Sequence, residues 1–391
     1  MIDRYHNKHG AVGISRRYQK EPELPVQRGS TVSFRTAEHS PREASDMSAI
    51  VGKEWNVQRG YFNTALRGIP PRASVAAAQR TLELWSRGDL DWIEWLDDVE
   101  RVRNEFATLI GMSPAQIGVG HTTAALVNVV AANLKSGSGV LVPEKEHNSN
   151  TIPFVTQQHR GIVVDTAPWS DFVNHISGKH AVVALSLVQS VDGSIADLRS
   201  ISQACRATGT LLCVDVTQAA GWLPFDASLA DIIVCSSYKW LMGPNGPAFI
   251  CLRADLVDSF RQLQPNWFAC KEPHAAPYGV QCLPATSAQK FDVVPGLISA
   301  SALLPALALI NEVGVSTVHR HNTGLAKNLC ARLGVAYNGS SIVMLEVPGA
   351  SQKLKTRGIR ATIRGDRVRI AIHIYNDMED VEALVTAVLS S

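Results

Sequence analysis

The sequence lacks both a charge imbalance and a long apolar run. Its 37 Lys and Arg residues nearly balance 35 Asp and Glu residues, so the formal net charge is only +2 and charge gives no reason to expect nucleic acid or an anionic membrane as a partner. No apolar stretch reaches the roughly 20 residues that span a bilayer. Charged residues occupy the N-terminus, where a signal peptide needs an apolar core. We therefore expect a cytoplasmic protein with no membrane segment.

Paired cysteines and paired histidines are also missing. The seven cysteines form no Cys-x-x-Cys pair, and several lie inside apolar runs such as Leu211-Leu-Cys-Val214. This placement is typical of buried, reduced thiols in the cytoplasm. The 12 histidines show no spacing typical of metal ligands, so we predict no metal site.

Three familiar signatures of catalysis or nucleotide binding are absent as well. The sequence has no Gly-x-Ser-x-Gly elbow for a serine nucleophile, and no Gly-x-Gly-x-x-Gly turn follows an expected strand. The turn Gly243-Pro-Asn-Gly246 lacks the Gly-Lys-Ser/Thr ending of a P-loop. The sequence therefore gives no support to a triad hydrolase, a dinucleotide-dependent enzyme or a P-loop enzyme.

Apolar runs that alternate with helical patterns dominate the chain from residue 117 onward. Continuous apolar strands separated by helices are buried on both faces, which indicates an α/β protein with a mostly parallel sheet. The expected strands cover 139–142, 161–164, 181–186, 210–215, 231–235 and 248–252, and the expected helices cover 73–88, 92–110, 197–208 and 295–313.

Changes in composition divide the chain into three parts. Residues 1–58 are rich in charge, His, Ser and Pro, so we expect a partly irregular arm that is loosely packed or wraps a partner subunit. Residues 59–315 would form the large sheet domain. Residues 316–391 carry helix, strand, strand and helix patterns and would form a small α+β domain.

Polar side chains follow several expected strands at the point where each strand ends. In open parallel sheets, ligands bind outside the carboxyl ends of the strands. One acid, one lysine, one histidine and several hydroxyls should therefore converge, from Pro143–Asn150, Ser186–Ser190, Asp215–Gln218 and Ser236–Lys239. A lysine amine with an aspartate partner is what pyridoxal phosphate chemistry requires, because the cofactor's aldehyde needs an amine and its ring nitrogen needs a carboxylate.

The order and spacing of five motifs resemble the class V aminotransferase family of fold-type I pyridoxal phosphate enzymes, which includes cysteine desulfurases and isopenicillin N epimerase. The resemblance covers about residues 60–390 and implies the fold-type I architecture, pyridoxal 5′-phosphate as cofactor and a homodimer. The matching motifs are Tyr61–Ala65, Glu146–Phe154, Asp215–Gln218, Ser236–Trp240 and Arg369–Asn376.

The resemblance implies a role for each residue around the cofactor ring. Lys239 would form the Schiff base and later move the Cα proton of the substrate, because a partly desolvated lysine is a usable base near neutral pH. Asp215 would pair with the protonated ring nitrogen, with helix capping as its alternative. Gln218 would bind the phenolic oxygen. His147 would stack on the ring and assist proton transfer, unless it is an ordinary strand-end histidine.

Hydroxyl groups would bind the cofactor phosphate. Thr122 and Thr123 begin an apolar helical run, and a helix N-terminus offers free N–H donors to an anion. Simple N-capping by threonine is compatible with this role. Ser236 and Tyr238, next to the lysine, match the family's other phosphate ligands, although many desulfurases have histidine where this chain has Tyr238.

The resemblance also implies two substrate contacts. Arg369 would hold the substrate carboxylate in a bidentate pair, and Asn63 would contact the substrate from the opening motif. A solvated charge is the alternative for Arg369, because Arg364 and Arg367 lie close to it in the sequence. Trp267, Phe268 and Tyr278 would either line the pocket for a bulky substrate or pack as ordinary loop residues.

The reaction itself follows from finer resemblances. Cysteine desulfurases carry a cysteine in this region to accept sulfur as a persulfide, but residues 355–366 of this chain contain none. The sequence therefore argues against persulfide transfer. Segments 215–226, 238–242 and 288–295 resemble hercynylcysteine sulfoxide lyases and lincosamide-pathway enzymes that process cysteine conjugates. This implies a C–S lyase acting by β-elimination on a cysteine S-conjugate or its sulfoxide. The alternatives are an aminotransferase, an epimerase, an oxidative decarboxylating deaminase, or a binding protein on a decayed scaffold.

Overall fold

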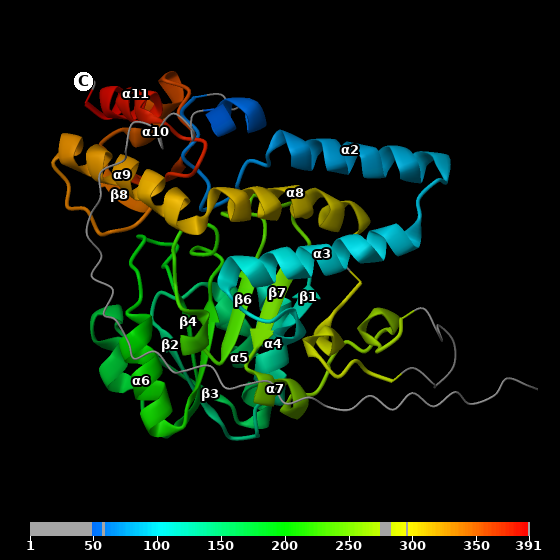
Figure 1. Ribbon diagram of the computed structural model, residues 1–391. Helices are drawn as coiled ribbons and strands as arrows, with labels where there is room; N and C mark the ends of the chain where they lie inside the picture. Colours follow the sequence, from blue (N-terminus) through cyan, green and yellow to red (C-terminus); the bar gives the residue numbers. More distant parts are fainter. Residues whose placement is uncertain (1–48, 57–58, 274–282, 295, 390–391) are drawn as a thin grey trace, which may run out of the picture. The chain divides into compact units, whose positions relative to one another are not determined.

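The computed structural model describes residues 49–56, 59–273, 283–294 and 296–389 (Figure 1). The expected N-terminal arm lies mostly outside the described residues, and so does Tyr278. The described residues all belong to one compact unit, His39–Ser391.

A seven-stranded sheet forms the centre of this unit, in the order β1-β7-β6-β5-β4-β2-β3. The pairs β2–β3, β2–β4, β4–β5 and β5–β6 are parallel, whereas β7 runs antiparallel to both of its neighbours. The expected α/β fold with a mostly parallel sheet is therefore confirmed. The strands are β1 (Ile117–Gly120), β2 (Gly139–Pro143), β3 (Val163–Ala167), β4 (His180–Ser186), β5 (Leu211–Asp215), β6 (Ile232–Ser236) and β7 (Ala248–Leu252).

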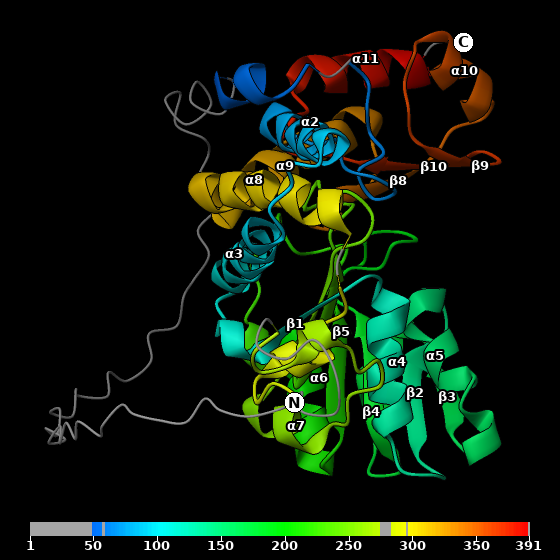
Figure 2. The ribbon, with the colours of Figure 1, turned by 90° about the vertical axis from the view of Figure 1, so that its right-hand side faces the viewer.

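Alternate residues of each central strand enter different hydrophobic cores. In β4, Val183 and Leu185 pack into the core shared with α3, α6 and α8, whereas Val182 and Ala184 pack into the core shared with α4 and α7. Figure 2 shows α4 and α5 on one side of the sheet and α3 on the other. Burial on both faces explains why these strands are continuous apolar runs.

The four helices expected within residues 73–313 are all present, with ends shifted by a few residues. Gly111, in the left-handed conformation with φ 70°, ends α3 and donates its N–H back to the last turn. The helices are α2 (Arg72–Arg87), α3 (Trp92–Ile110), α4 (Thr123–Asn133), α5 (Ile152–Val155), α6 (Leu198–Thr208), α7 (Ala254–Ser259), α8 (Leu297–Val313), α9 (Val315–Leu333), α10 (Ala350–Thr356) and α11 (Met378–Leu389). Short 3-10 turns are η1 (Pro114–Gln116), η2 (Asn148–Asn150), η3 (Gln158–Arg160), η4 (Trp169–His175), η5 (Ala227–Leu229), η6 (Trp267–Ala269) and η7 (Ala288–Phe291).

A second, antiparallel sheet of three strands lies in the C-terminal part of the chain, in the order β8-β10-β9. The strands are β8 (Ile342–Glu346), β9 (Thr362–Arg364) and β10 (Arg367–Ala371), and they share a core with α9, α10 and α11. The structure adds α10 and a third strand to the expected helix, strand, strand and helix. The domain boundaries at 58 and 315 stay a prediction.

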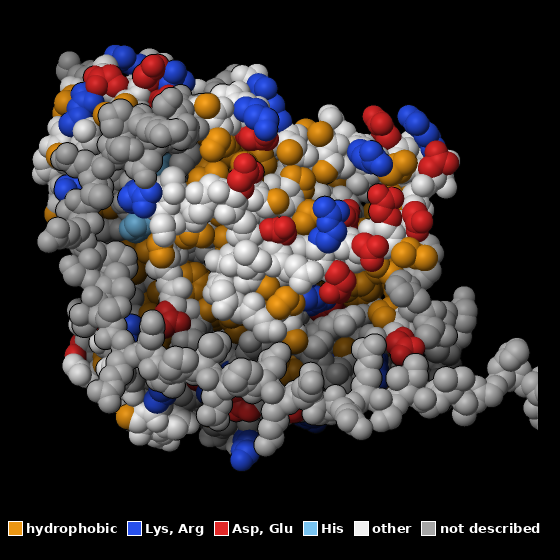
Figure 3. All heavy atoms as spheres, viewed as in Figure 1, with side chains coloured by type: hydrophobic (Ala, Val, Ile, Leu, Met, Phe, Trp, Pro, Cys, Tyr) orange, Lys and Arg blue, Asp and Glu red, His pale blue; other side chains and the backbone are white. Residues whose placement is uncertain are grey.

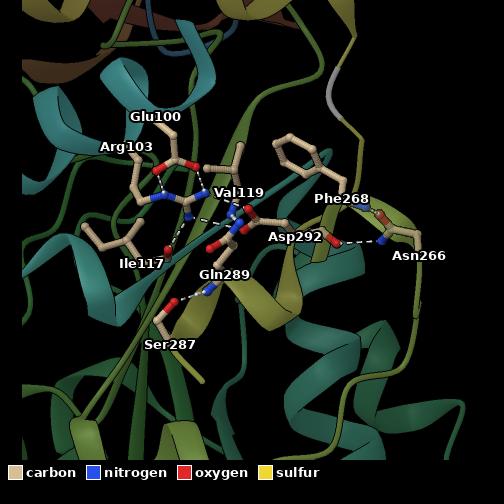
Figure 4. Close-up of polar contacts among 9 residues, drawn as sticks. All are labelled: Glu100, Arg103, Ile117, Val119, Asn266, Phe268, Ser287, Gln289 and Asp292. Carbon is tan, nitrogen blue, oxygen red and sulfur yellow. Dashed lines mark hydrogen bonds and ion pairs between the residues drawn. The ribbon is translucent and has the colours of Figure 1, made fainter. Parts of the chain in front are cut away.

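A buried ion pair connects α3 with β1 and the segment after η7 (Figure 4). Arg103 Nη2 lies 2.6 Å from Asp292 Oδ2, and Asp292 Oδ1 accepts the N–H of Val119 at 2.7 Å. Glu100 binds the same guanidinium from the previous turn of α3. Because Val119 lies in β1, this cluster positions the strand that leads to Thr122 and Thr123.

The cysteines mostly agree with the expectation of buried, reduced thiols. Five are free and buried, and burial raises the pKa of their thiols: Cys205, Cys213, Cys235, Cys251 and Cys330. The expectation is wrong for Cys270, which is disulfide-bonded. Cys270 lies in an irregular segment after η6 and not in an apolar strand. Its backbone forms an isolated antiparallel β-bridge with Pro284. An apolar run therefore predicts a buried, reduced thiol only for the cysteines that lie within it, and Cys270 does not.

Among the described helices, none alone has the length and apolar composition needed to cross a membrane; α8 and α9 meet that test only together, as a pair bent by 82°.

Candidate active site

The structure gathers the residues expected to bind the cofactor around one pocket at the carboxyl ends of the central strands. The cavity has a volume of about 250 Å³. The expected residues that line it are Thr122, Thr123, His147, Asp215, Gln218, Ser236, Tyr238 and Lys239, and the additional lining residues are Ala124, Ser149, Ser186, Ser190 and Thr217. These side chains follow β1, β2, β4, β5 and β6, because the carboxyl ends of parallel strands meet at one edge of a sheet.

Lys239 lies in the turn after β6 and is 8% exposed. Burial lowers the pKa of its amine, and the charge of Arg369 lowers it further, whereas Asp215 opposes the shift. Its Nζ lies 5.7 Å from the centre of the Tyr238 ring. Gly68 approaches the same turn so closely that a Cβ there would lie 2.0 Å from the carbonyl oxygen of Lys239. Sequence reasoning missed Gly68, because only the folded chain places it beside the lysine.

Asp215 ends β5 and is buried. Its Oδ1 accepts the N–H of Thr217 at 2.8 Å, which is the local capping role that competed with cofactor binding. Its Oδ2 makes no hydrogen bond to the described residues. Capping therefore uses one carboxylate oxygen and leaves the other available.

Hydroxyl groups meet at the N-terminus of α4. Thr122 caps this helix by accepting the N–H of Ala125 at 3.2 Å. The hydroxyl oxygens of Thr123 and Ser236 lie 2.7 Å apart, and Thr217 Oγ1 lies 3.3 Å from Thr123 Oγ1 and accepts the N–H of Ser236. Thr217 lies inside the Asp215–Gln218 motif, but only its contacts reveal its place in the hydroxyl cluster.

His147 is the N-cap residue of η2 and directly follows the buried Glu146. Its Nδ1 accepts the N–H of Ser149 at 3.2 Å, so the proton of the neutral ring is on Nε2. Burial lowers the pKa of His147, and the charge of Lys239 adds to the effect. Glu146 accepts the backbone N–H groups of His147 and Ser186 at 2.8 and 2.7 Å and the amide of Gln189 at 2.9 Å. Glu146, which the sequence motif contains without a role, therefore holds the histidine loop against β4.

Both ends of the Gln218 amide are occupied by protein groups. Trp240 Nε1 donates to Gln218 Oε1 at 2.7 Å, and Gln218 Nε2 donates to the carbonyl oxygen of Ala65 at 3.0 Å. An amide nitrogen carries two hydrogens. One N–H of Gln218 is therefore left for a ligand, and its direction is set by Trp240.

Arg369 and Asn63 do not line this pocket. Arg369 lines a neighbouring cavity of about 90 Å³, and Ser190 lines both cavities. Arg369 Nη1 donates to the carbonyl oxygen of Ser190 at 2.5 Å, and its Nη2 donates to Thr362 Oγ1 at 3.2 Å. The Thr362 hydroxyl donates to Asn63 Oδ1 at 2.7 Å. The two residues expected to bind the substrate are thus joined through Thr362.

Trp267 and Phe268, two aromatic residues considered as pocket-lining residues, lie outside the main pocket. Phe268 is buried and stacks on Trp95 of α3, with ring centres 6.5 Å apart. Neither Trp267 nor Phe268 lines the main pocket. In the part of the chain that the structure describes, no group of His, Cys, Asp or Glu side chains is arranged to hold a metal ion.

The donor set fits pyridoxal 5′-phosphate. Lys239 and Asp215 are buried residues that line the pocket, and within the described residues neither Lys239 Nζ nor Asp215 Oδ2 has a hydrogen-bond partner. An aldehyde and a protonated ring nitrogen would satisfy them. The hydroxyl cluster at the start of α4 would satisfy a phosphate.

Known proteins resemble the chain in sequence and in fold. An uncharacterized aminotransferase from Bacillus subtilis (strain 168) is 28% identical over 317 residues, which is 74% of this chain and 83% of that protein. A kynureninase from Deinococcus radiodurans is 27% identical over 275 residues, which is 66% of each chain. The solved structure of a cystine C–S lyase in complex with cysteine persulfide has a TM-score of 0.75 at 20% identity and covers 85% of this chain and 97% of its own, which establishes a shared fold.

A family model gives the remaining comparison. The model for aminotransferase class V matches residues 93–348. This segment contains the lysine turn, the hydroxyl cluster and the Asp215–Gln218 motif. The chain therefore belongs to the class V aminotransferase family, whose cofactor is pyridoxal 5′-phosphate.

Proposed function

We propose that this protein is a pyridoxal phosphate-dependent C–S lyase that cleaves a cysteine S-conjugate, or its sulfoxide, by β-elimination. The observation that carries the proposal is the buried amine of Lys239, whose pKa is lowered, beside the free carboxylate oxygen of Asp215 in one pocket. A lysine in this state can accept a proton from the Cα of a bound amino acid. The reaction consumes water and yields a thiol or sulfenic acid, pyruvate and ammonia.

The chain's own residues would divide the work as follows. Lys239 would hold the cofactor and accept the Cα proton, and Asp215 would keep the ring nitrogen protonated. Gln218 donates to the ring oxygen with its remaining N–H. His147 covers the ring with a neutral imidazole whose Nε2 carries the proton. When bound, the cofactor would supply an electron-withdrawing ring that stabilises negative charge at Cα of the substrate.

The positions of the cysteines support a lyase over a desulfurase. Each free cysteine that the structure describes is buried in the sheet or in a helix, and burial raises the pKa of its thiol, whereas a sulfur acceptor must be an accessible thiolate. Among the described residues, no cysteine lines the main pocket. Sulfur would then leave with the departing group.

The test is incubation of the cofactor-loaded protein with S-alkyl cysteines and their sulfoxides. Pyruvate and the thiol or sulfenate product should appear together in equal amounts, and Lys239→Ala should abolish both. An aminotransferase would require a keto acid and retain the C–S bond, an epimerase would invert Cα without release of sulfur, and an oxidative deaminase would consume oxygen. Any of these results without thiol release would overturn the lyase assignment. The aminotransferase is the second candidate, because the Bacillus subtilis relative carries that name.

We also propose a cytoplasmic homodimer that serves an ergothioneine-like or antibiotic pathway. Support for the dimer comes from apolar side chains on α2 and α3: Val75, Leu82, Trp85 and Ile93 are 43–60% exposed. Figure 3 shows hydrophobic side chains gathered over α2, α3 and α8. Light scattering of the wild-type protein should give a molar mass twice that of one chain, and Trp85→Glu should lower the measured mass. A wild-type mass equal to that of one chain would contradict the proposal.

A further inference from the structure

Three arginines share one face of the small sheet beside the active site. Arg364 of β9 lies directly opposite Arg367 of β10, and Arg369 lies opposite Thr362. Side chains two residues apart on a strand point to the same face, so all four share it. Together with Ser190, Val191 and Met344 they line the cavity of about 90 Å³ next to the main pocket.

The positive charge of this group is only partly balanced by neighbouring acids. Like charges placed directly opposite in antiparallel strands repel each other. Glu346 of β8 lies opposite Arg367, but within the described residues Arg364, Arg367 and Arg369 form no ion pair. Asp366, in the turn between the two strands, instead accepts the N–H of Gly349.

Arg369 has one hydrogen-bond donor without a partner. Its Nε is buried and has no hydrogen-bond partner, although Nη1 and Nη2 are held by Ser190 and Thr362. Burial, together with the charge of Arg364, lowers the pKa of Arg369 to about 10. An anion in the cavity would reduce the repulsion among the three arginines.

The cavity is also placed where a substrate could reach it. Ser190 lines both this cavity and the main pocket, and its carbonyl oxygen accepts a hydrogen bond from Arg369. If Arg369 holds the α-carboxylate of an amino acid in the main pocket, then Arg364 and Arg367 are further cations on the same face. One carboxylate does not require three arginines.

We propose that Arg364, assisted by Arg367, binds a second carboxylate at the far end of the substrate side chain. The substrate class is then a cysteine conjugate whose S-substituent carries an acid. This inference rests on the proposed function for the orientation of the substrate, with the α-carboxylate at Arg369. Arg364 and Arg367 are exposed at the cavity rim and so are accessible to a ligand that enters from solvent.

The test measures binding with ligands that cannot undergo C–S cleavage. L-2-aminopimelate replaces the sulfur of S-(2-carboxyethyl)cysteine by a methylene, and its ω-amide differs only by the loss of the distal charge. Dissociation constants for the cofactor-loaded, full-length protein come from titration calorimetry and from the change in the cofactor's absorption. We expect the diacid to bind at least about 10-fold more tightly than the amide, as for a charge-assisted hydrogen bond.

Arg364→Gln should reduce this preference to about twofold or less, and Arg364→Lys should retain part of it. Arg357→Gln, an exposed arginine of the same domain outside the cavity, is the matched control and should leave the preference unchanged. Added salt should weaken the preference, because the two rim arginines are exposed. Thermal unfolding of each variant confirms that it is folded.

Equal affinities for diacid and amide in the wild type, failure of both to bind, or an unchanged preference in Arg364→Gln would each overturn the inference. Failure of the lyase proposal has a different signature, namely absence of pyruvate from all conjugates while the diacid preference persists. Pyruvate from neutral conjugates without a diacid preference would keep the lyase and refute the second carboxylate.

Discussion

The indole of Trp240 donates its N–H to the side-chain oxygen of Gln218 at 2.7 Å, and this bond orients the amide in the active site. Trp240 follows Lys239 directly, and Gln218 follows β5. Because the oxygen is occupied by Trp240, the amide nitrogen is left to donate to Ala65 and to a ligand. One buried tryptophan thus links the lysine turn, the β5 turn and the opening motif.

Trp240→Phe should therefore weaken cofactor binding. The substitution removes the donor that orients Gln218 and should reduce cofactor affinity by about 10-fold, with a shift in the absorption of the bound cofactor. Trp222→Phe is a matched control, because Trp222 is also fully buried but donates to the backbone oxygen of Gln218. Both variants should lose similar stability. The same loss of cofactor affinity in both would contradict the orienting role.

Gly68→Ala should displace the lysine turn. The new Cβ would lie 2.0 Å from the carbonyl oxygen of Lys239 and 3.0 Å from the Cα of Met242, and both are backbone atoms that cannot rotate away. We expect the free energy of unfolding to fall by about 1–3 kcal/mol, with poorer cofactor loading. Gly324→Ala in α9, where the Cβ meets nothing within 4 Å, should keep or raise stability. Equal cofactor loading in wild type and Gly68→Ala would refute the steric argument.

Lys239 should make the stability of the cofactor-free protein depend on pH. Burial lowers its pKa in the folded chain, so between that value and the ordinary pKa of 10.5 the unfolded chain binds more protons. The free energy of unfolding should therefore rise with pH across this window and fall as the pH drops through it.

Lys239→Met should remove this rise and raise stability at neutral pH, as measured by urea unfolding at a series of pH values. Lys327→Met, at an exposed position of α9, should leave the slope unchanged. An identical slope in wild type and Lys239→Met would show that the amine is not desolvated.

Breaking the ion pair between Arg103 and Asp292 should be costly. Asp292→Asn leaves a buried guanidinium without its full counter-charge, and such losses cost about 3–5 kcal/mol. Arg101→Gln breaks an exposed pair with Asp98 on the same helix and should cost about 1 kcal/mol or less. Urea unfolding compares the two. A similar, small cost for both variants would mean that the buried pair does not hold α3 to β1.

Local patterns in the sequence were sufficient for six of the seven strands of the main sheet, all except β1, and for most of the residues that line the main pocket. The apolar runs became β2 and β4 to β7 because strands buried on both faces need apolar residues throughout, whereas β3 is a partly exposed edge strand. Residues of three of the five motifs meet in one pocket with Thr122 and Thr123, because the ends of parallel strands lie side by side. Each of these features depends on the order of residues in short segments.

The remaining features depend on contacts between segments far apart in the chain. Gly68 approaches Lys239 only when the opening motif packs under the lysine turn. The sequence assigns no role to Thr217. In the structure its hydroxyl oxygen lies 3.3 Å from Thr123 Oγ1 and accepts the N–H of Ser236. The helix α10 was missed because seven residues are too short to show a clear period.

The sequence by itself determined the fold class, the family and most of the polar residues that line the main pocket, because strand periodicity and closely spaced motifs are properties of short segments. Only the tertiary structure decided how those residues are oriented and which other groups join them. It separated Arg369 from the main pocket, joined it to Asn63 through Thr362, and set it on one face with Arg364 and Arg367. Such relationships arise from strand register and packing over distances that no local pattern encodes.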